Sequence, residues 1–220
     1  MLSDTNKLFI RYFDLGVFDG GEIDLMINLL SKFQVDYEIY GFEANPSLAK
    51  KLITKYKKNI KVKIVPIALG NEEGEAILYL NKNLVGSSLY KDKNNVLQNK
   101  RVPVPLCKFS KWLQDNLSSE WGSEFNIIKA NIEGAEWDVW QDLKTANLIS
   151  NFSLWLGTKE GYDGWSLDLK KIASMKSKAS KLTEEMKALG VFVYRFSSFT
   201  KRIANSDISA MVSKAIESRK

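Results

Sequence analysis

The sequence predicts an α/β fold in which helices cover both faces of a mostly parallel, twisted sheet. Apolar runs typical of strands alternate with segments whose apolar residues recur at helical spacing. Glycine-containing turns follow some of the strand-like runs. Strands joined through helices require right-handed crossovers, which place neighbouring strands parallel to each other. A length of 220 residues suits one such domain, and we expect it to span residues 1–220.

The start of the chain is predicted to form a strand, a helix and a second strand. Residues 8–13 are a short apolar run rich in β-forming residues, and they lead into a glycine-rich stretch at 14–21. Residues 22–33 carry apolar side chains at helical spacing, and residues 37–42 return to strand character. The glycine-rich stretch is therefore predicted to be the loop between the first strand and the first helix.

A second helix is predicted to begin at Asn45 and Pro46. Asparagine caps the free amides of a helix start, proline suits the first turn, and a buried stripe runs on to Tyr56. Residues 62–69 are predicted as one further strand, and residues 76–80 as another after a polar turn. The alternation of helix and strand thus continues.

Two prolines mark residues 102–107 as a predicted edge strand. Pro103 and Pro105 lack the amide hydrogen at alternate positions, which does little harm where no second neighbour pairs. A looser stretch, residues 81–101, precedes this strand. The alternation then resumes, with helices predicted over residues 109–117 and 135–143 and strands over 126–132 and 152–156.

The last long helix is the clearest element of the sequence. Residues 169–189 keep an apolar stripe at helical spacing, and Gly190 stands where such a helix ends. Residues 191–196 are then predicted as a strand, and a short basic helix is expected at the end of the chain.

The composition excludes several kinds of chemistry. Cys107 is the only cysteine, and the chain has no histidine. An internal disulfide, a zinc site built from paired cysteines and nucleophilic catalysis through a Ser–His or Cys–His pair are therefore ruled out. Any proton transfer must use a carboxylate, a lysine or a tyrosine.

The remaining composition is that of a folded protein. Hydrophobic residues make up 45% of the chain and charged residues 26%. No window is apolar over the roughly 18 residues that a membrane span needs. Residues 1–7 lack the pattern of a secretory leader, so a cytoplasmic location is expected. The net charge of +6 favours an anionic partner, but the basic runs fall mostly opposite the apolar stripes, so a nucleic acid is an unlikely partner.

Candidate binding residues follow the first two predicted strands. In an open parallel sheet, ligands bind at the carboxyl ends of the strands. Asp14, Gly16 and Gly20 follow the first strand, and Glu43 follows the second, where a carboxylate can hold the two hydroxyls of a ribose. A plain tight turn and a solvated loop acid are the alternative explanations. Phe18 stands where a dinucleotide fingerprint has its second glycine, which disfavours a nicotinamide cofactor and leaves S-adenosylmethionine as a fitting ligand.

Five motifs in order carry a resemblance to a known family. Between about Phe9 and Leu143 the chain resembles the FkbM family of S-adenosylmethionine-dependent O-methyltransferases, which implies a Rossmann-like class I methyltransferase fold. The motifs are residues 14–20, the run Gly41-Phe42-Glu43-Ala44-Asn45-Pro46, residues 67–74, Gly86-Ser87-Ser88, and the run from Ile128 to Glu136.

The resemblance implies roles for individual residues. Asp14, Gly16 and Gly20 would line the methionine end and the ribose of the cofactor, and Glu43 would take the ribose hydroxyls. Ala44, Ala68 and Leu69 would border the adenine. Asn131, also expected at the cofactor, replaces the aspartate of the family pattern, which removes a charge at the end of its strand.

Methyl transfer to oxygen also needs a group that accepts the proton of the acceptor hydroxyl. Our hypothesis is that Glu133 is this base, with Asp163 and Asp19 in reserve; the alternative is that Glu133 satisfies amides at the start of the following helix. Acceptor contacts are expected from Ser87 and from a glycine-rich loop at residues 157–165. In that loop Lys159, Tyr162 and Trp165 suit a hydroxylated ligand.

The resemblance also implies the substrate class. The expected acceptor is a sugar, a nucleotide sugar or a glycan, with a deoxyhexose such as rhamnose among the candidates and S-adenosylhomocysteine as the other product. O-methylation of a small secondary metabolite or of RNA ribose, and a catalytically inactive cofactor-binding module, are the alternatives. A divalent metal is chemically feasible but not expected, and the chain could belong to a larger glycan-assembly polypeptide.

Overall fold

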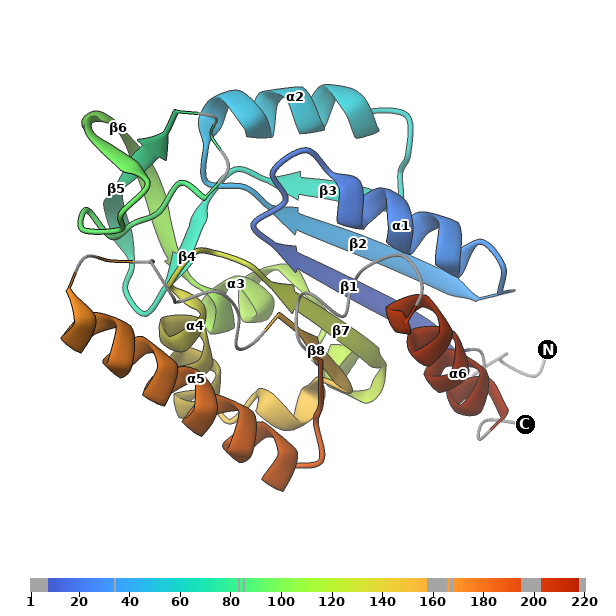
Figure 1. Ribbon diagram of the computed structural model, residues 1–220. Helices are drawn as coiled ribbons and strands as arrows, with labels where there is room; N and C mark the ends of the chain where they lie inside the picture. The colour runs from blue at the N-terminus through green and yellow to red at the C-terminus, as the bar shows by residue number, and fades with distance from the viewer. Residues whose placement is uncertain are drawn as a thin grey trace.

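A parallel sheet forms the centre of the computed structural model (Figure 1). The structure describes residues 8–33, 35–82, 84, 86–157, 166, 168–194 and 203–217. Within them, a six-stranded sheet has the order β3-β2-β1-β7-β8-β9, and its neighbouring strands pair in parallel. The strands are β1 (Phe9–Leu15), β2 (Asp36–Phe42), β3 (Val62–Val65), β7 (Phe125–Ala130), β8 (Leu154–Leu156) and β9 (Phe192–Tyr194).

The strand order creates a crevice beside β1. From β1 the chain adds β2 and β3 on one side, and later adds β7, β8 and β9 on the other. Connections on the two sides of β1 therefore diverge, and in such sheets the carboxyl ends at this switch point form a binding crevice. The predicted α/β Rossmann-like fold is confirmed.

Helices cover both faces of the sheet because residues along each strand alternate between two cores. Ile10 and Tyr12 of β1 belong to one buried cluster, whereas Phe13 and Leu15 belong to the other. The first cluster includes side chains of α1 (Gly21–Leu30), α2 (Pro46–Tyr56) and α6 (Ile203–Glu217). The second includes side chains of α3 (Phe109–Asn116), α4 (Glu136–Thr145) and α5 (Leu169–Ala188).

A second, three-stranded sheet corrects the prediction of a single strand over residues 62–69. Pro66 lacks an amide hydrogen, and the segment divides there into β3 and β4 (Ala68–Gly70). β4 pairs with β6 (Val96–Lys108), which also pairs with β5 (Gly74–Asn81), in the order β4-β6-β5. Figure 1 shows this small sheet beyond the arrowheads of β1 to β3, at the carboxyl edge of the large sheet.

The prediction of an edge strand over residues 102–107 was wrong, because β6 is the middle strand of the small sheet. Pro103 and Pro105 pair with β5 on one side, whereas the β4 pairing covers only Leu106 to Lys108. The two prolines are tolerated because no strand pairs on their second side in the described part of the chain. The tolerance therefore comes from the short length of β4.

Further differences from the predictions remain. β6 begins at Val96, so the end of the stretch 81–101 that was expected to be looser is strand. β1 runs on to Leu15, so Asp14 belongs to the strand and is fully buried instead of lying in the loop. The predicted short basic helix at the end is α6, a 15-residue helix with Lys214 as its lysine. The prediction that this helix is basic was wrong, because four basic residues lie outside its bounds: Lys201, Arg202, Arg219 and Lys220. Among the described residues, no helix is both long and apolar enough to cross a membrane.

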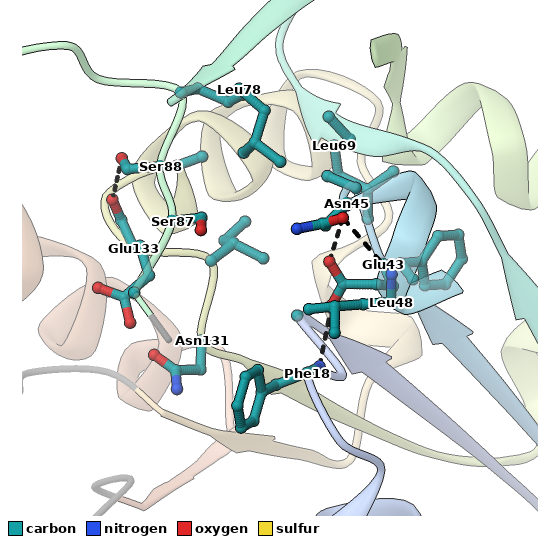
Figure 2. A pocket seen from close by; sticks show the side chains of 18 of the residues that line it. Phe18, Glu43, Asn45, Leu48, Leu69, Leu78, Ser87, Ser88, Asn131 and Glu133 are labelled. Carbon is teal, nitrogen blue, oxygen red and sulfur yellow. Dashed lines mark hydrogen bonds between the residues drawn. The ribbon is translucent and has the colours of Figure 1, made fainter. Parts of the chain in front are cut away.

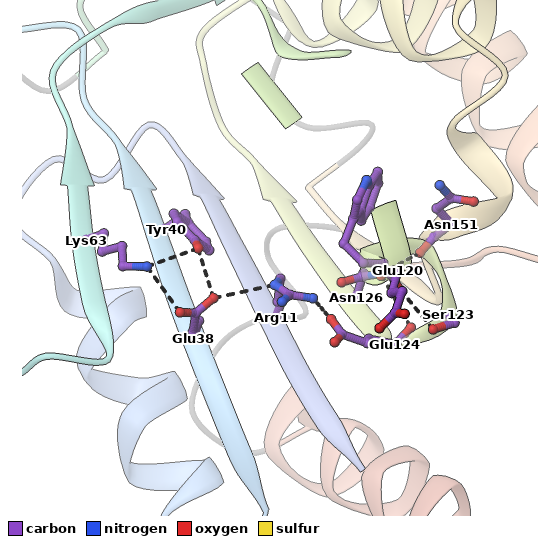
Figure 3. A network of polar contacts seen from close by, with 10 residues as sticks. Arg11, Glu38, Tyr40, Lys63, Glu120, Ser123, Glu124, Asn126 and Asn151 are labelled. Atoms are coloured by element: carbon purple, nitrogen blue, oxygen red, sulfur yellow. Dashed lines mark hydrogen bonds and ion pairs between the residues drawn. The ribbon is translucent and has the colours of Figure 1, made fainter. Parts of the chain in front are cut away.

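A network of charged side chains links the amino-terminal half of the sheet (Figure 3). Arg11 of β1 forms ion pairs with Glu38 of β2 and with Glu124, which precedes β7. Glu38 accepts hydrogen bonds from the Tyr40 hydroxyl at 2.8 Å and from Lys63 Nζ at 3.1 Å. Arg11 and Glu38 are cross-strand neighbours, so this network connects adjacent strands on the face opposite α1.

Candidate functional site

A cavity of about 330 Å³ lies between the two sheets, at the carboxyl ends of β1, β2 and β7. Figure 2 shows its walls, with Glu43 and Asn45 on one side and Ser87, Ser88 and Glu133 on the other. A cavity of this size at the switch point of a parallel sheet is the expected place for a small-molecule ligand. Eight of the residues predicted for the site line it: Gly16, Glu43, Ala44, Ala68, Leu69, Ser87, Asn131 and Glu133.

Glu43 is held in one orientation by two backbone amides. It follows β2 directly and is only 8% exposed. Phe18 N–H donates to Oε2 at 2.9 Å, and Asn45 N–H donates to Oε1 at 2.8 Å. Burial raises the pKa of this carboxyl, and the two amide bonds oppose that rise. Each oxygen keeps a further lone pair, so the carboxylate can accept two more hydrogen bonds from a ligand.

Phe18 forms part of the cavity wall. Its φ is 55°, in the left-handed region that residues other than glycine rarely adopt. In this conformation its amide bonds to Glu43, and its ring lies beside Asn131 in Figure 2. This bond adds to the backbone hydrogen bonds that the amides of Gly16 and Val17 donate to the Phe42 carbonyl, so the loop after β1 is tied to the end of β2.

Asp14 and Lys129 form an ion pair below the cavity. They are register neighbours on β1 and β7, and their side chains are 0% and 1% exposed. Lys129 Nζ lies 2.8 Å from Asp14 Oδ1 and donates to the carbonyl of Gly16 at 2.6 Å. Burial raises the pKa of Asp14 to about 6, although Lys129 opposes the rise. Asp14 does not line the cavity, so its role as a direct cofactor contact stays a prediction, and the observed role is to hold Lys129.

The two glycines of the loop make room for protein atoms. A Cβ on Gly16 would lie 2.1 Å from the carbonyl oxygen of Asn131, and a Cβ on Gly20 would lie 2.4 Å from the Tyr56 hydroxyl. Tyr56 in turn donates to the Gly20 carbonyl at 2.9 Å. Gly20 is therefore packed against α2 and does not line the cavity, whereas Gly16 brings the end of β1 close to the end of β7.

The loop after β7 is organised by Glu136, which the sequence analysis did not single out. Its buried carboxylate accepts hydrogen bonds from the amides of Ile132, at 2.8 Å, and Gly134, at 2.9 Å. Burial raises the pKa of this carboxyl. Satisfying amides at the start of α4 is the alternative role for Glu133, whereas the structure has Glu136 accept from two amides of the loop just before that helix. An acid in the first turn of α4 was the signal that could have identified it.

Glu133 is connected to the loop between β5 and β6. Its φ is 57°, and its Oε2 lies 3.0 Å from Lys93 Nζ. Lys93, also missed from the sequence, is buried and donates to the carbonyl of Gly86 at 2.6 Å and to Asn95 Oδ1 at 2.7 Å. Ser88 Oγ donates to the Glu133 carbonyl at 2.8 Å. The segment 86–95 is thereby fastened against the β7–α4 loop at the cavity wall.

The remaining candidates divide into two groups. Asp19 lines the cavity, and its Oδ1 accepts the amide hydrogen of Gly21 at 2.9 Å. No group of three metal-binding side chains gathers within the described ranges. Lys159, Tyr162, Asp163 and Trp165 lie outside the described residues, so their predicted roles are not placed in space.

Comparison with known proteins leaves the family open. No family model matches the chain. No curated protein matches it. Among solved structures, it is similar to a crystal structure of the methyltransferase FkbM from Methylobacillus flagellatus KT, with 11% sequence identity and a TM-score of 0.37. The similar part covers 64% of this chain and 30% of that chain.

Proposed function

We propose that this protein is an S-adenosylmethionine-dependent O-methyltransferase that acts on a hydroxyl of a sugar or glycan. The observation that carries the proposal is the Glu43 carboxylate, fixed by the amides of Phe18 and Asn45 at the carboxyl end of β2. It faces a cavity at the switch point of a parallel sheet, where a carboxylate after the second strand suits the hydroxyls of a ribose.

The cavity residues fit an adenosyl group. Glu43 offers acceptors to a diol, and the wall beside it is apolar where Ala44, Ala68 and Leu69 lie, as a flat base requires. Phe18 occupies the position at which a pyrophosphate-binding loop needs a small residue, which favours a nucleoside without phosphates. When bound, S-adenosylmethionine supplies a strongly electrophilic methyl group on its sulfonium. The protein then has to align the acceptor and remove its proton.

Glu133 is the proposed base. It lies across the cavity from Glu43 in Figure 2, on a loop held by Glu136, and Ser87 lines the same side. Its carboxylate would accept the proton of the acceptor hydroxyl while Lys93, 3.0 Å away, holds the side chain in place. Asn131 lines the cavity directly after β7, where it would contact the cofactor.

The acceptor class rests on the resemblance of the sequence motifs to FkbM methyltransferases. A sugar, nucleotide sugar or glycan is the proposed acceptor, with a deoxyhexose such as rhamnose as one form. Lys159, Tyr162 and Trp165 are the proposed acceptor contacts, with Asp163 as a reserve base. A role within a larger glycan-assembly polypeptide belongs to the same proposal.

Glu43→Gln is expected to weaken the binding of S-adenosylhomocysteine about tenfold or more. The amide nitrogen of glutamine would replace one acceptor oxygen, so it would face a backbone N–H and could not accept from a ribose hydroxyl. Isothermal titration of the purified chain measures the change, with exposed Glu75→Gln as the matched control. Equal affinity of Glu43→Gln and wild type would contradict the ribose assignment, and a wild type that binds no S-adenosylhomocysteine would contradict the proposed function.

Glu133→Gln is expected to slow methyl transfer at least about a hundredfold while leaving the affinity for S-adenosylhomocysteine unchanged, because glutamine cannot take up the proton. The acceptor comes from a screen of nucleotide sugars and short glycans, read by mass spectrometry as the gain of one methyl group. Glu72→Gln, in an exposed turn, is the control. A Glu133→Gln rate close to that of wild type would rule out Glu133 as the base. Cofactor binding without product from any acceptor would instead indicate a binding module.

A further inference from the structure

In the side-chain amide of Asn45, the oxygen accepts hydrogen bonds, whereas the nitrogen has no partner among the described residues. Asn45 is 3% exposed and lines the cavity. Its Oδ1 caps α2 by accepting hydrogen bonds from the amides of Ser47, at 3.0 Å, and Leu48, at 3.4 Å. Its Nδ2 is buried and has no hydrogen-bond partner among the described residues. A buried amide group left without a partner is costly, so this nitrogen is a candidate for a ligand contact.

The orientation of the amide is determined by the helix cap. The backbone amides of Ser47 and Leu48, at the start of α2, are both N–H donors. The atom of the Asn45 side chain that meets them must therefore be its oxygen. The nitrogen must then point the other way, and Figure 2 shows it directed toward the interior of the cavity. A helix cap therefore leaves a hydrogen-bond donor at a fixed position on the same wall as Glu43.

The two neighbouring groups define what the wall can recognise. The Glu43 carboxylate accepts hydrogen bonds, and the side-chain amide of Asn45, two residues further along the chain, donates them. A ligand that satisfies both carries hydroxyl donors beside an acceptor. In a purine nucleoside the ring nitrogen N3 is an acceptor that lies on the ribose side of the base. The backbone amide of Asn45 cannot serve this nitrogen, because it already donates to Glu43.

We propose that Asn45 Nδ2 donates a hydrogen bond to N3 of the adenine ring and so makes the cavity selective for a purine nucleoside. This inference rests on the proposed function, because it assigns a base contact to the same site. Asn45 is then a binding residue in addition to a helix cap. Its two roles can be separated, since they use different atoms of one amide.

The experiment compares two ligands on three proteins. Wild type, Asn45→Ser and Asn45→Asp are titrated with S-adenosylhomocysteine and with its 3-deaza analogue, in which a C–H group replaces N3. Serine and aspartate both cap helices well, so the variants keep an acceptor for Ser47 and Leu48. An ionised aspartate has no donor, and the serine hydroxyl sits on Cβ, one bond short of the position that Nδ2 occupies, so both variants lose the donor at that position. Urea unfolding of the three proteins checks that α2 is retained.

Wild type is expected to bind the 3-deaza analogue about tenfold more weakly than S-adenosylhomocysteine, the size of one neutral hydrogen bond. Asn45→Ser is expected to bind both ligands with one reduced affinity, and Asn45→Asp to bind both more weakly still, because its second oxygen adds a negative charge beside Glu43. The ratio of the dissociation constants of the two ligands is the decisive readout, because a loosened helix would weaken the binding of both ligands equally.

Three results would overturn the inference, and they differ in whether the proposed function fails as well. If wild type binds S-adenosylhomocysteine but shows no preference over the 3-deaza analogue, the N3 contact is wrong and the proposed function stands. If wild type binds neither ligand, the proposed function fails and the base contact fails with it. A preference that persists in Asn45→Ser would also contradict the assignment of the donor to Asn45.

Discussion

Lys129→Met is expected to lower the free energy of unfolding at pH 7 by about 3 to 5 kcal/mol, the cost of leaving one partner of a buried ion pair uncompensated. Asp14 is fully buried and lies 2.8 Å from Lys129 Nζ. The same nitrogen also donates to the Gly16 carbonyl, so its removal would release the loop after β1 as well. Urea unfolding followed by circular dichroism measures the loss.

The loss is expected to depend on pH with a definite sign. The folded-state pKa of Asp14 is raised from 3.8 to about 6, so the folded protein takes up a proton at higher pH than the unfolded chain does. The stability that this carboxyl contributes is therefore present below pH 3.8 and is lost as the pH rises toward 6. Without Lys129 the carboxyl would be protonated more readily, so the defect of Lys129→Met should be smaller at pH 5 than at pH 7.

A double-mutant cycle separates the interaction energy between Asp14 and Lys129 from the effect of changing each residue alone. The double variant Asp14→Asn, Lys129→Met should lose less free energy of unfolding than the two single variants lose together, because no unpaired charge remains in it. The control is Lys111→Met, which removes the exposed pair with Asp115 and should leave the free energy of unfolding almost unchanged. A Lys129→Met protein that is as stable as this control at pH 7 would show that the buried pair does not hold the site together.

Gly16→Ala is the second large expected effect, with a loss of stability of more than about 3 kcal/mol or a failure to fold. The new Cβ would lie 2.1 Å from the carbonyl oxygen of Asn131, a backbone atom that cannot move without separating β1 from β7. The φ of +84° adds about 1 to 2 kcal/mol for any residue other than glycine. Binding of S-adenosylhomocysteine should weaken in parallel, because Phe18 and Asn131 both border the cavity.

Gly190→Ala is the control for this prediction, because it isolates backbone strain. Its φ of +77° is close to that of Gly16, and no atom lies within 4 Å of the added Cβ. The difference between the two variants in the free energy of unfolding therefore measures the cost of the clash between the new Cβ and the Asn131 carbonyl oxygen. Equal losses for Gly16→Ala and Gly190→Ala would mean that strain alone explains the glycine.

Asp14, Lys129 and Gly16 support the cavity, because they join the end of β1 to the end of β7. Glu43 and Asn45 present the polar groups that a ligand would meet on one wall. Variants of the first group should lose stability and affinity together, whereas variants of Asn45 that keep the helix cap should lose affinity with little change in stability.

Much of the fold could be predicted from the sequence because its signals are local. The apolar runs of β1, β2 and β7 and the stripe of α5 each depend on residues a few positions apart. The start of α2 at Pro46 was predicted correctly because Asn45 caps the amides two and three residues later. The position of Glu43 at the cavity followed in turn from the end of β2 and the parallel order of the strands.

Strand partners could not be predicted in the same way. Residues 62–69 look like one strand, yet β3 pairs with β2 and β4 pairs with β6. The choice depends on which strands lie nearby in space, and only Pro66 marks the division in the sequence. The same holds for β6, whose prolines indicated an edge although the strand lies between two neighbours.

Spacing along the chain was enough to predict the α/β class, most of the helices and strands, and the acid at the end of β2. Which side chains meet depends on the folded arrangement. Asp14 and Lys129 are 115 positions apart, and Lys93 reaches Glu133 from a segment without periodicity. Whether a charged group contacts a ligand or pairs with a distant residue depends on burial and distance in three dimensions, and no local pattern records either.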